Sequence, residues 1–268
     1  MKLTDRPNSN HSNRKLLSGM VVAVLLVTGP PLRAEDDAAK SVLRAMSDYV
    51  GSQDTIELTF DSDIEVITPQ LEKIQFSNSG EALLVRPDKL RAHRVSGHAN
   101  VELFYDGVKA TVFGKEINGY AEFEAPGTVD QLITAMRAGH GVAMPGADLL
   151  LAKSYDVLVT DVMESRYLGR AIIDGHECEH LAFRNFDTDW QLWVEAGDQP
   201  IPRKLVITSQ TRNSAPQYTL RFMSWKTGVK PTPDAFSFVP PAGAKEIGPE
   251  ILIELDELPQ GAPAGGQQ

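Results

Sequence analysis

The chain has 268 residues, of which 42% are hydrophobic and 23% charged, and its formal net charge is −10. This length can bury a sizeable core without disulfides or metals, and the acidic balance disfavours nucleic acid and anionic membrane surfaces, which attract basic patches. The single cysteine, Cys178, excludes an intrachain disulfide, so core packing must supply the stability.

Residues 1–34 are typical of a secretory signal peptide. A basic pair, Arg14 and Lys15, precedes an apolar run over residues 16–27. A run of about 12 residues is shorter than the roughly 20 that span a bilayer. We therefore expect cleavage near Glu35, no transmembrane anchor afterwards, and a mature protein in the periplasm or outside the cell.

The mature chain begins with one predicted helix and continues as strands. Apolar residues recur at i, i+3, i+4 and i+7 over residues 36–50, which indicates an amphipathic helix. From residue 56 to residue 124 the period is two, with turns expected at residues 78–80, 106–107 and 118–119. Such a meander is typical of a sandwich or barrel.

A second helical region separates this meander from another one. Thr128 is the expected N-cap of a helix that runs to His140, and a short helical turn is expected at 147–152. Strands are expected at 163–173, 178–183, 190–194, 201–208 and 218–225, and a mostly disordered tail rich in Gly, Pro and acidic residues at 244–268. The prediction is a single, mainly β (α+β) domain over residues 35–243. We expect a strongly curved antiparallel sheet, or half-open β-barrel, with helices covering its concave face.

Rare residues gather at His176, Cys178 and His180. A strand would project all three from one face in steps of about 6.5–7 Å, which is wide for three ligands of one ion. One hypothesis is a copper or zinc site, since these metals accept N and S ligands. The interpretation we favour is that Cys178 is a small core residue and that the histidines lie near strand ends.

The sequence carries no signature of catalysis. It has no Gly-x-Ser-x-Gly elbow, Walker loop, His-Glu-x-x-His or Gly-x-Gly-x-x-Gly motif. Cys178 lies between Glu177 and Glu179, an acidic setting that does not favour a reactive thiolate. Carboxylates spaced two apart are expected by chance in an acidic chain. The prediction is therefore a protein that is not an enzyme and has no cofactor.

Aromatic and flexible apolar side chains support two interpretations. They can form an ordinary core, or they can line an apolar cavity between a curved sheet and a helical lid, where Met and Leu would suit an acyl chain. The residues expected in this lining and lid are Phe104, Phe113, Tyr120, Leu132, Met136, Met144, Leu149, Leu150, Phe183, Trp193 and Phe222.

The C-terminal third resembles a known family. Residues 174–183 follow the pattern DGxxCxHLxF, residues 189–208 follow DxQxWxExGxxPxPRKxVIT, and residues 236–244 follow FxFxPPxGA. These patterns resemble the DUF2092 family of predicted periplasmic proteins, over about residues 36–247. The resemblance implies a relation to the LolA/LolB type of periplasmic lipoprotein carriers and receptors, whose half-open barrels hold acyl chains under a helical lid.

The function implied by this resemblance is a periplasmic binding protein for a lipid, acyl chain or other apolar ligand, with envelope lipoproteins as candidate partners. No functional residue of the carriers maps onto this chain by a motif. Two alternatives stay open at this point: a copper- or zinc-binding protein that uses His176, Cys178 and His180, and an envelope scaffold with no small ligand.

Overall fold

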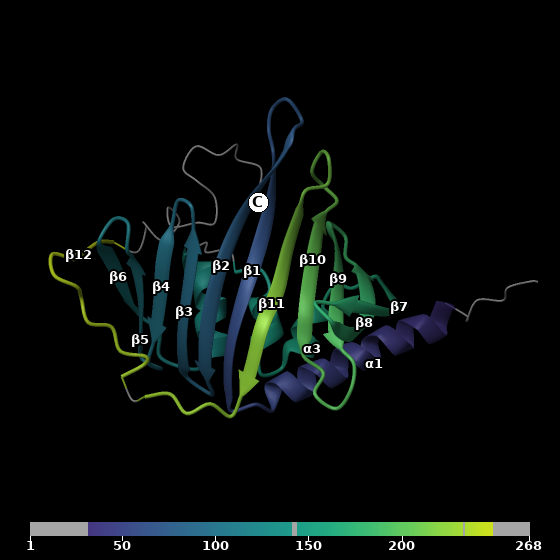
Figure 1. Ribbon diagram of the computed structural model, residues 1–268, viewed down its shortest axis with the longest axis horizontal. Coiled ribbons are helices and arrows are strands. Elements are labelled where there is room, and N and C mark those ends of the chain that lie inside the picture. Colours follow the sequence, from purple (N-terminus) through teal and green to yellow (C-terminus); the bar gives the residue numbers. More distant parts are fainter. Residues whose placement is uncertain (1–31, 141–143, 233, 249–268) are drawn as a thin grey trace, which may run out of the picture. The chain divides into compact units, whose positions relative to one another are not determined.

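One sheet of twelve strands organises the protein (Figure 1). The computed structural model describes residues 32–140, 144–232 and 234–248. The strand order is β12-β6-β5-β4-β3-β2-β1-β11-β10-β9-β8-β7. Neighbouring strands are antiparallel except β12 and β6, which are parallel. In the described part of the chain the sheet is open, with β12 and β7 at its two edges.

The elements have the following bounds: α1 (Leu32–Gly51), β1 (Thr55–Ile67), β2 (Lys73–Val85), β3 (Lys89–Ser96), β4 (Asn100–Tyr105), β5 (Lys109–Gly114), β6 (Gly119–Glu124), α2 (Val129–His140), the 3₁₀-helix η1 (Ala147–Leu150), α3 (Ser154–Leu158), β7 (Glu164–Ile173), β8 (His176–Arg184), β9 (Thr188–Glu195), β10 (Pro202–Ser209), β11 (Gln217–Thr227) and β12 (Lys245–Glu246).

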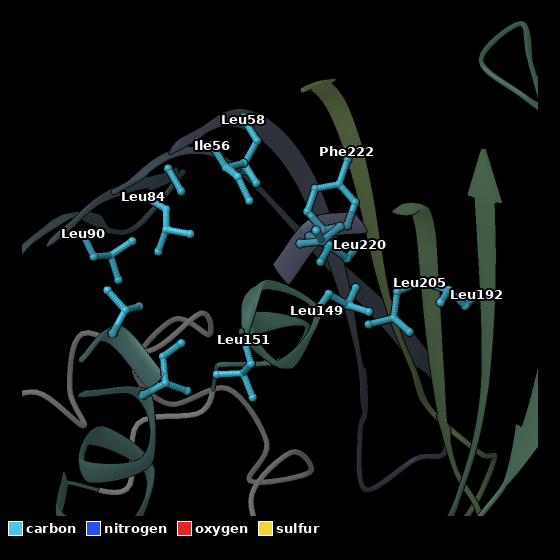
Figure 2. Packing of buried hydrophobic residues seen from close by; sticks show 14 of the residues in the cluster. Ile56, Leu58, Leu84, Leu90, Leu149, Leu151, Leu192, Leu205, Leu220 and Phe222 are labelled. Carbon is cyan, nitrogen blue, oxygen red and sulfur yellow. The ribbon is translucent and has the colours of Figure 1, made fainter. Parts of the chain in front are cut away.

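The main hydrophobic core lies on the concave face of this sheet. Alternate residues of the strands point there, as Ile56 and Leu58 of β1 do, and Figure 2 shows the sheet curving around them. Helix α1 supplies Leu43 and Met46 to the core and contacts β7, β8 and β9. The predicted fold class, a curved antiparallel sheet with helices over its concave face, is confirmed.

Helix α2 begins with a capping box. The backbone N–H of Gln131 donates to Thr128 Oγ1 at 3.3 Å, and the backbone N–H of Thr128 donates to Gln131 Oε1 at 2.8 Å. Two N–H groups that the helix itself cannot satisfy are thereby bonded. The N-cap predicted at Thr128 is confirmed.

The turn expected at residues 78–80 was a wrong prediction. Asn78 and Gly80 lie inside β2, which pairs with β1 along its whole length. The chain turns at residues 68–72 instead, where Leu71 has a φ of 65°. Gly80 serves packing, because a Cβ there would lie 2.4 Å from the Phe60 ring on the facing strand. A glycine inside a strand can make room for a side chain of the neighbouring strand. In the sequence alone such a glycine looks the same as a glycine in a turn.

The turn expected at residues 106–107 is present, and the one expected at 118–119 lies over residues 115–118, with Gly119 as the first residue of β6. Asp174 and Gly175 form a further two-residue turn between β7 and β8. Gly107, Asn118, Asp174 and Gly175 all have positive φ, with values of 95°, 45°, 49° and 86°. Both central residues of the 174–175 turn therefore have the left-handed conformation that a type I′ hairpin needs.

The two ends of the domain differ from the prediction. Helix α1 begins at Leu32, before the helix expected at residue 36, and residues 1–31 of the predicted signal lie outside the described residues. The tail was expected from residue 244, but β12 adds to the sheet edge beside β6, and the N–H of Ile247 donates to Tyr120 O at 2.8 Å. Residues 249–268 lie outside the described residues. None of the described helices has the length and hydropathy needed to cross a bilayer.

Candidate functional site

A cavity of about 220 Å³ lies on the concave face, between the first half of the sheet and the α2 region. Strands β1 to β5 and β11 form its walls, and α2 and residues 144–150 form the opposite side, which we call the lid. The lining residues are Leu58, Phe60, Ala82, Leu84, Leu90, Ala92, His93, Arg94, Val101, Leu103, Val112, Val129, Ile133, Met136, Met144, Pro145, Gly146, Ala147, Leu150, Tyr218, Leu220 and Phe222.

The lining is almost wholly apolar. Its polar members are His93, Arg94 and Tyr218, and none of the described lining residues is a carboxylate. The volume of about 220 Å³ exceeds that of the ~150 Å³ apolar cavity known to bind benzene. It is below the ~300–1,000 Å³ of pockets for drug-sized ligands. The cavity therefore suits an apolar group such as part of a hydrocarbon chain.

Two arginines hold residues 144–150 of the lid in place. Arg137 of α2 forms an ion pair with Asp148 and donates from Nη2 to Met144 O at 2.8 Å. Arg86, which precedes β3, donates from Nη2 to Leu150 O at 2.6 Å. The Arg137 contacts join α2 to residues 144–148, and the Arg86 contact joins Leu150 to the connection between β2 and β3, so together they hold residues 144–150 against α2 and the sheet.

Gly146 is a point where the lid packs closely against the sheet. Its φ is +83°, and a Cβ at this position would lie 2.5 Å from Leu220 Cδ2 of β11. Figure 2 shows Leu220 and Leu149 directed toward the same part of the core. Glycine satisfies both the left-handed backbone and the close approach.

The structure brings six of the eleven predicted residues to this region. Met136, Met144, Leu150 and Phe222 line the cavity. Leu132 and Leu149 belong to the same core and are 1% and 0% exposed, but they lie behind the lining.

Three predicted lining residues lie on the convex face instead. The rings of Phe104, Phe113 and Tyr120 surround Phe238, with centroid separations of 5.4, 5.4 and 5.1 Å. Their neighbours Leu103 and Val112 point into the cavity, so strand alternation directs these rings away from it. Phe104, Phe113 and Tyr120 therefore do not line the cavity, contrary to the prediction.

Two further aromatic residues lie at the other end of the sheet. Phe183 stacks on Trp190 with ring centroids 3.9 Å apart and belongs to the concave core. Trp193 lies on the convex face in a small separate cluster with Cys178 and Val206. Neither Phe183 nor Trp193 lines the cavity.

His176, Cys178 and His180 share one face of β8, as alternation predicts, but each has its own neighbour. His176 Nδ1 lies 3.2 Å from Glu195 Oε1. His180 stacks on Trp193 at 4.1 Å, and burial lowers the pKa of its imidazole. Cys178 is fully buried, and burial raises the pKa of its thiol. Over the described residues no three His, Cys, Asp or Glu side chains are placed to hold one metal ion.

The prediction missed the aliphatic wall of the cavity. Leu58, Leu84, Leu90, Leu103 and Val112 come from five consecutive strands and form most of one side. The period of two in these strands indicated that alternate residues share a face. The pairing of the strands was needed to show which face of each strand meets the lid.

The fold and cavity together define a class of protein with a curved open sheet, helices over its concave face and an apolar interior. Residues 39–248 match the model of DUF2092, described as a predicted periplasmic protein, and the chain belongs to this family. The family description agrees with the periplasmic location predicted from the sequence. No curated protein matches the chain.

Several solved structures are similar to this one. An uncharacterized conserved protein from Thermus thermophilus has a TM-score of 0.47 and 9% identity, over 79% of this chain and 99% of its own. LprF from Mycobacterium bovis has a TM-score of 0.45 and 14% identity, over 74% and 98%. The lipoprotein LppX from Mycobacterium tuberculosis has a TM-score of 0.37 and 12% identity, over 73% and 98%.

Proposed function

We propose that the protein is a non-enzymatic periplasmic binding protein that holds an apolar chain, such as the acyl chain of a lipid, between its sheet and its lid. The observation that carries this proposal is the apolar cavity of about 220 Å³ under α2 and residues 144–150. Envelope lipoproteins, which carry acyl chains, are the candidate partners.

The physical reason is the environment that the cavity offers. Cavities lined by aliphatic groups exclude water, and a hydrocarbon that enters gains roughly 25 cal/mol for each Å² of apolar surface removed from water. Two methionines, Met136 and Met144, lie in the lid side of the lining. Their unbranched thioether side chains adapt to ligands of different shape.

Binding of the apolar fluorescent probe 1-N-phenylnaphthylamine tests the proposal. The wild-type protein should bind it, and Ala92→Phe, which fills the cavity, should weaken binding at least tenfold. Ala135→Phe on the exposed side of α2 is the matched control and should bind like wild type. Mass spectrometry of an organic extract of protein purified from its own host should reveal a lipid. Absence of probe binding, or equal binding by Ala92→Phe and wild type, would contradict the proposal.

A further inference from the structure

Two polar residues lie on the concave face next to the cavity. Ser62 of β1 and Asn78 of β2 are direct cross-strand partners. Ser62 is two residues after Phe60 on β1, and Asn78 is two residues before Gly80 on β2, so each lies on the same face as that residue. Phe60 lines the cavity. The polar pair is therefore one same-face step, about 7 Å, from the cavity wall.

These two side chains are buried without hydrogen bonds. Ser62 is 1% exposed and Asn78 is 2% exposed. Ser62 Oγ and both Asn78 Oδ1 and Nδ2 have no hydrogen-bond partner in the part of the chain that the structure describes. Buried polar atoms are bonded in the large majority of cases, so three unbonded atoms on adjacent residues need an explanation.

The convex face of the same two strands shows the ordinary arrangement. Ser79 Oγ donates to Asp61 Oδ1 at 2.6 Å, and Ser77 Oγ donates to Asp63 Oδ1 at 2.5 Å. Polar cross-strand partners therefore bond to each other on the exposed side, and it is the pair facing the core that does not.

A cation lies on the neighbouring strand β3, one same-face step from the position opposite Asn78. Arg94 of β3 is the register partner of Gly80 and lines the cavity half-buried. It is the one permanently charged side chain among the described lining residues. A guanidinium recognises carboxylate and phosphate through two parallel hydrogen bonds.

We propose that the ligand is an amphiphile with an anionic head, whose apolar chain lies in the cavity and whose carboxylate or phosphate is bound by Arg94, Asn78 and Ser62. The proposal rests on the function proposed above and adds the chemistry of the head group. The Arg94 guanidinium, the Asn78 amide and the Ser62 hydroxyl all donate hydrogen bonds, which an anionic oxygen accepts. Phe60 lines the cavity with its ring over Gly80, next to the polar pair, and would contact the first carbons of the chain.

Competition for bound 1-N-phenylnaphthylamine tests this proposal on the delipidated protein, with three ligands that share a saturated chain: palmitate, palmitoyl lysophosphatidate and hexadecanol. Wild type should bind palmitate or the lysophosphatidate at least tenfold more tightly than hexadecanol, and the preference between these two identifies the head group. Arg94→Met should remove most of this difference and leave hexadecanol binding within about twofold, since a hydrogen bond to a charged group is worth roughly tenfold or more in affinity.

Two further variants separate binding from folding. Asn78→Leu should weaken palmitate binding but leave the thermal midpoint unchanged or raised, because the amide makes no bond within the described structure. Lys89→Met removes a cation from the same strand at a position that faces away from the cavity, and should bind all three ligands like wild type. If wild type binds neither palmitate nor the lysophosphatidate more tightly than hexadecanol, the head-group proposal fails while the proposed function stands. If none of the three displaces the probe, both fail.

Discussion

Gly146 offers a quantitative test of how the lid packs on the sheet. In Gly146→Ala the new Cβ meets Leu220 Cδ2 at 2.5 Å, and the residue must keep a φ of +83°. The left-handed conformation costs a non-glycine residue about 1–2 kcal/mol, and overpacking in a core typically costs about 1–3 kcal/mol. We therefore expect the free energy of unfolding to fall by about 2–4 kcal/mol, after allowance for the lower entropy of the unfolded alanine chain.

Two other glycines separate these contributions. Gly175 has almost the same φ, +86°, but nothing lies within 4 Å of its would-be Cβ. Gly97 has neither a positive φ nor a neighbour within that distance. Gly175→Ala should therefore lose only the backbone contribution, about 1 kcal/mol, and Gly97→Ala should stay within about 0.5 kcal/mol of wild type.

The assay is urea unfolding followed by tryptophan fluorescence, with free energies compared at constant slope. A double-mutant cycle with Leu220→Ala should recover the steric part, with a coupling energy of about 1–2 kcal/mol. Equal losses in Gly146→Ala and Gly175→Ala would refute the close approach of lid and sheet.

Three further outcomes follow from the contacts described. Arg137→Met should weaken binding of 1-N-phenylnaphthylamine several-fold, because residues 144–148 lose two contacts to α2; unchanged binding would show that the lid is held without them. Because burial lowers the pKa of His180 in the folded state, the unfolded chain takes up this proton first, so stability should fall as the pH drops below about 6.5. His180→Gln should reduce that loss between pH 7.5 and pH 5, and identical acid profiles would contradict it. The Cys178 thiol, buried and with a raised pKa, should react with iodoacetamide at pH 8 only after unfolding; labelling of the native protein would refute its burial.

Much of the fold could be predicted because its signals are local. The period of two, the turn at Asp106-Gly107 and the Thr128 N-cap each depend on a few adjacent residues, and the structure contains them all. The prediction of a turn at residues 78–80 was wrong because the role of Gly80 depends on a contact that is not local. This stretch has the composition of a turn, but Gly80 is required by the Phe60 ring on a strand that is distant in sequence.

Assignment of side chains to the cavity depended on information that alternation alone lacks. Both faces of β4 and β5 carry large apolar side chains, Leu103 and Val112 on one and Phe104 and Phe113 on the other, so these residues alone do not say which face meets the lid. Phe104 and Phe113 are buried because Phe238, far along the chain, covers the convex face. In the sequence prediction, the segment around Phe238 only marked the end of the domain. The prediction therefore did not include a buried region on the convex face of β4 and β5.

The cavity lies under the half of the sheet formed by β1 to β5, because the side chains facing the core differ between this half and the half formed by β7 to β9. Over β7 to β9, α1 contributes Leu43 and Met46, and Phe183 stacks on Trp190, so large side chains occupy this half. Over β1 to β5 the concave positions include the small residues Gly80, Ala82 and Ala92, and the facing loop contributes Gly146 and Ala147. Small residues on both sides of a gap cannot fill it, and Gly146 against β11 and the Arg86 hydrogen bond to Leu150 hold residues 146–150 in their place beside it. Of these small residues, Gly80 and Gly146 have no room for a side chain, so enlarging Ala92 is the change that should reduce the cavity without disturbing the α1 half. Ala92→Phe is therefore the sharper probe of function.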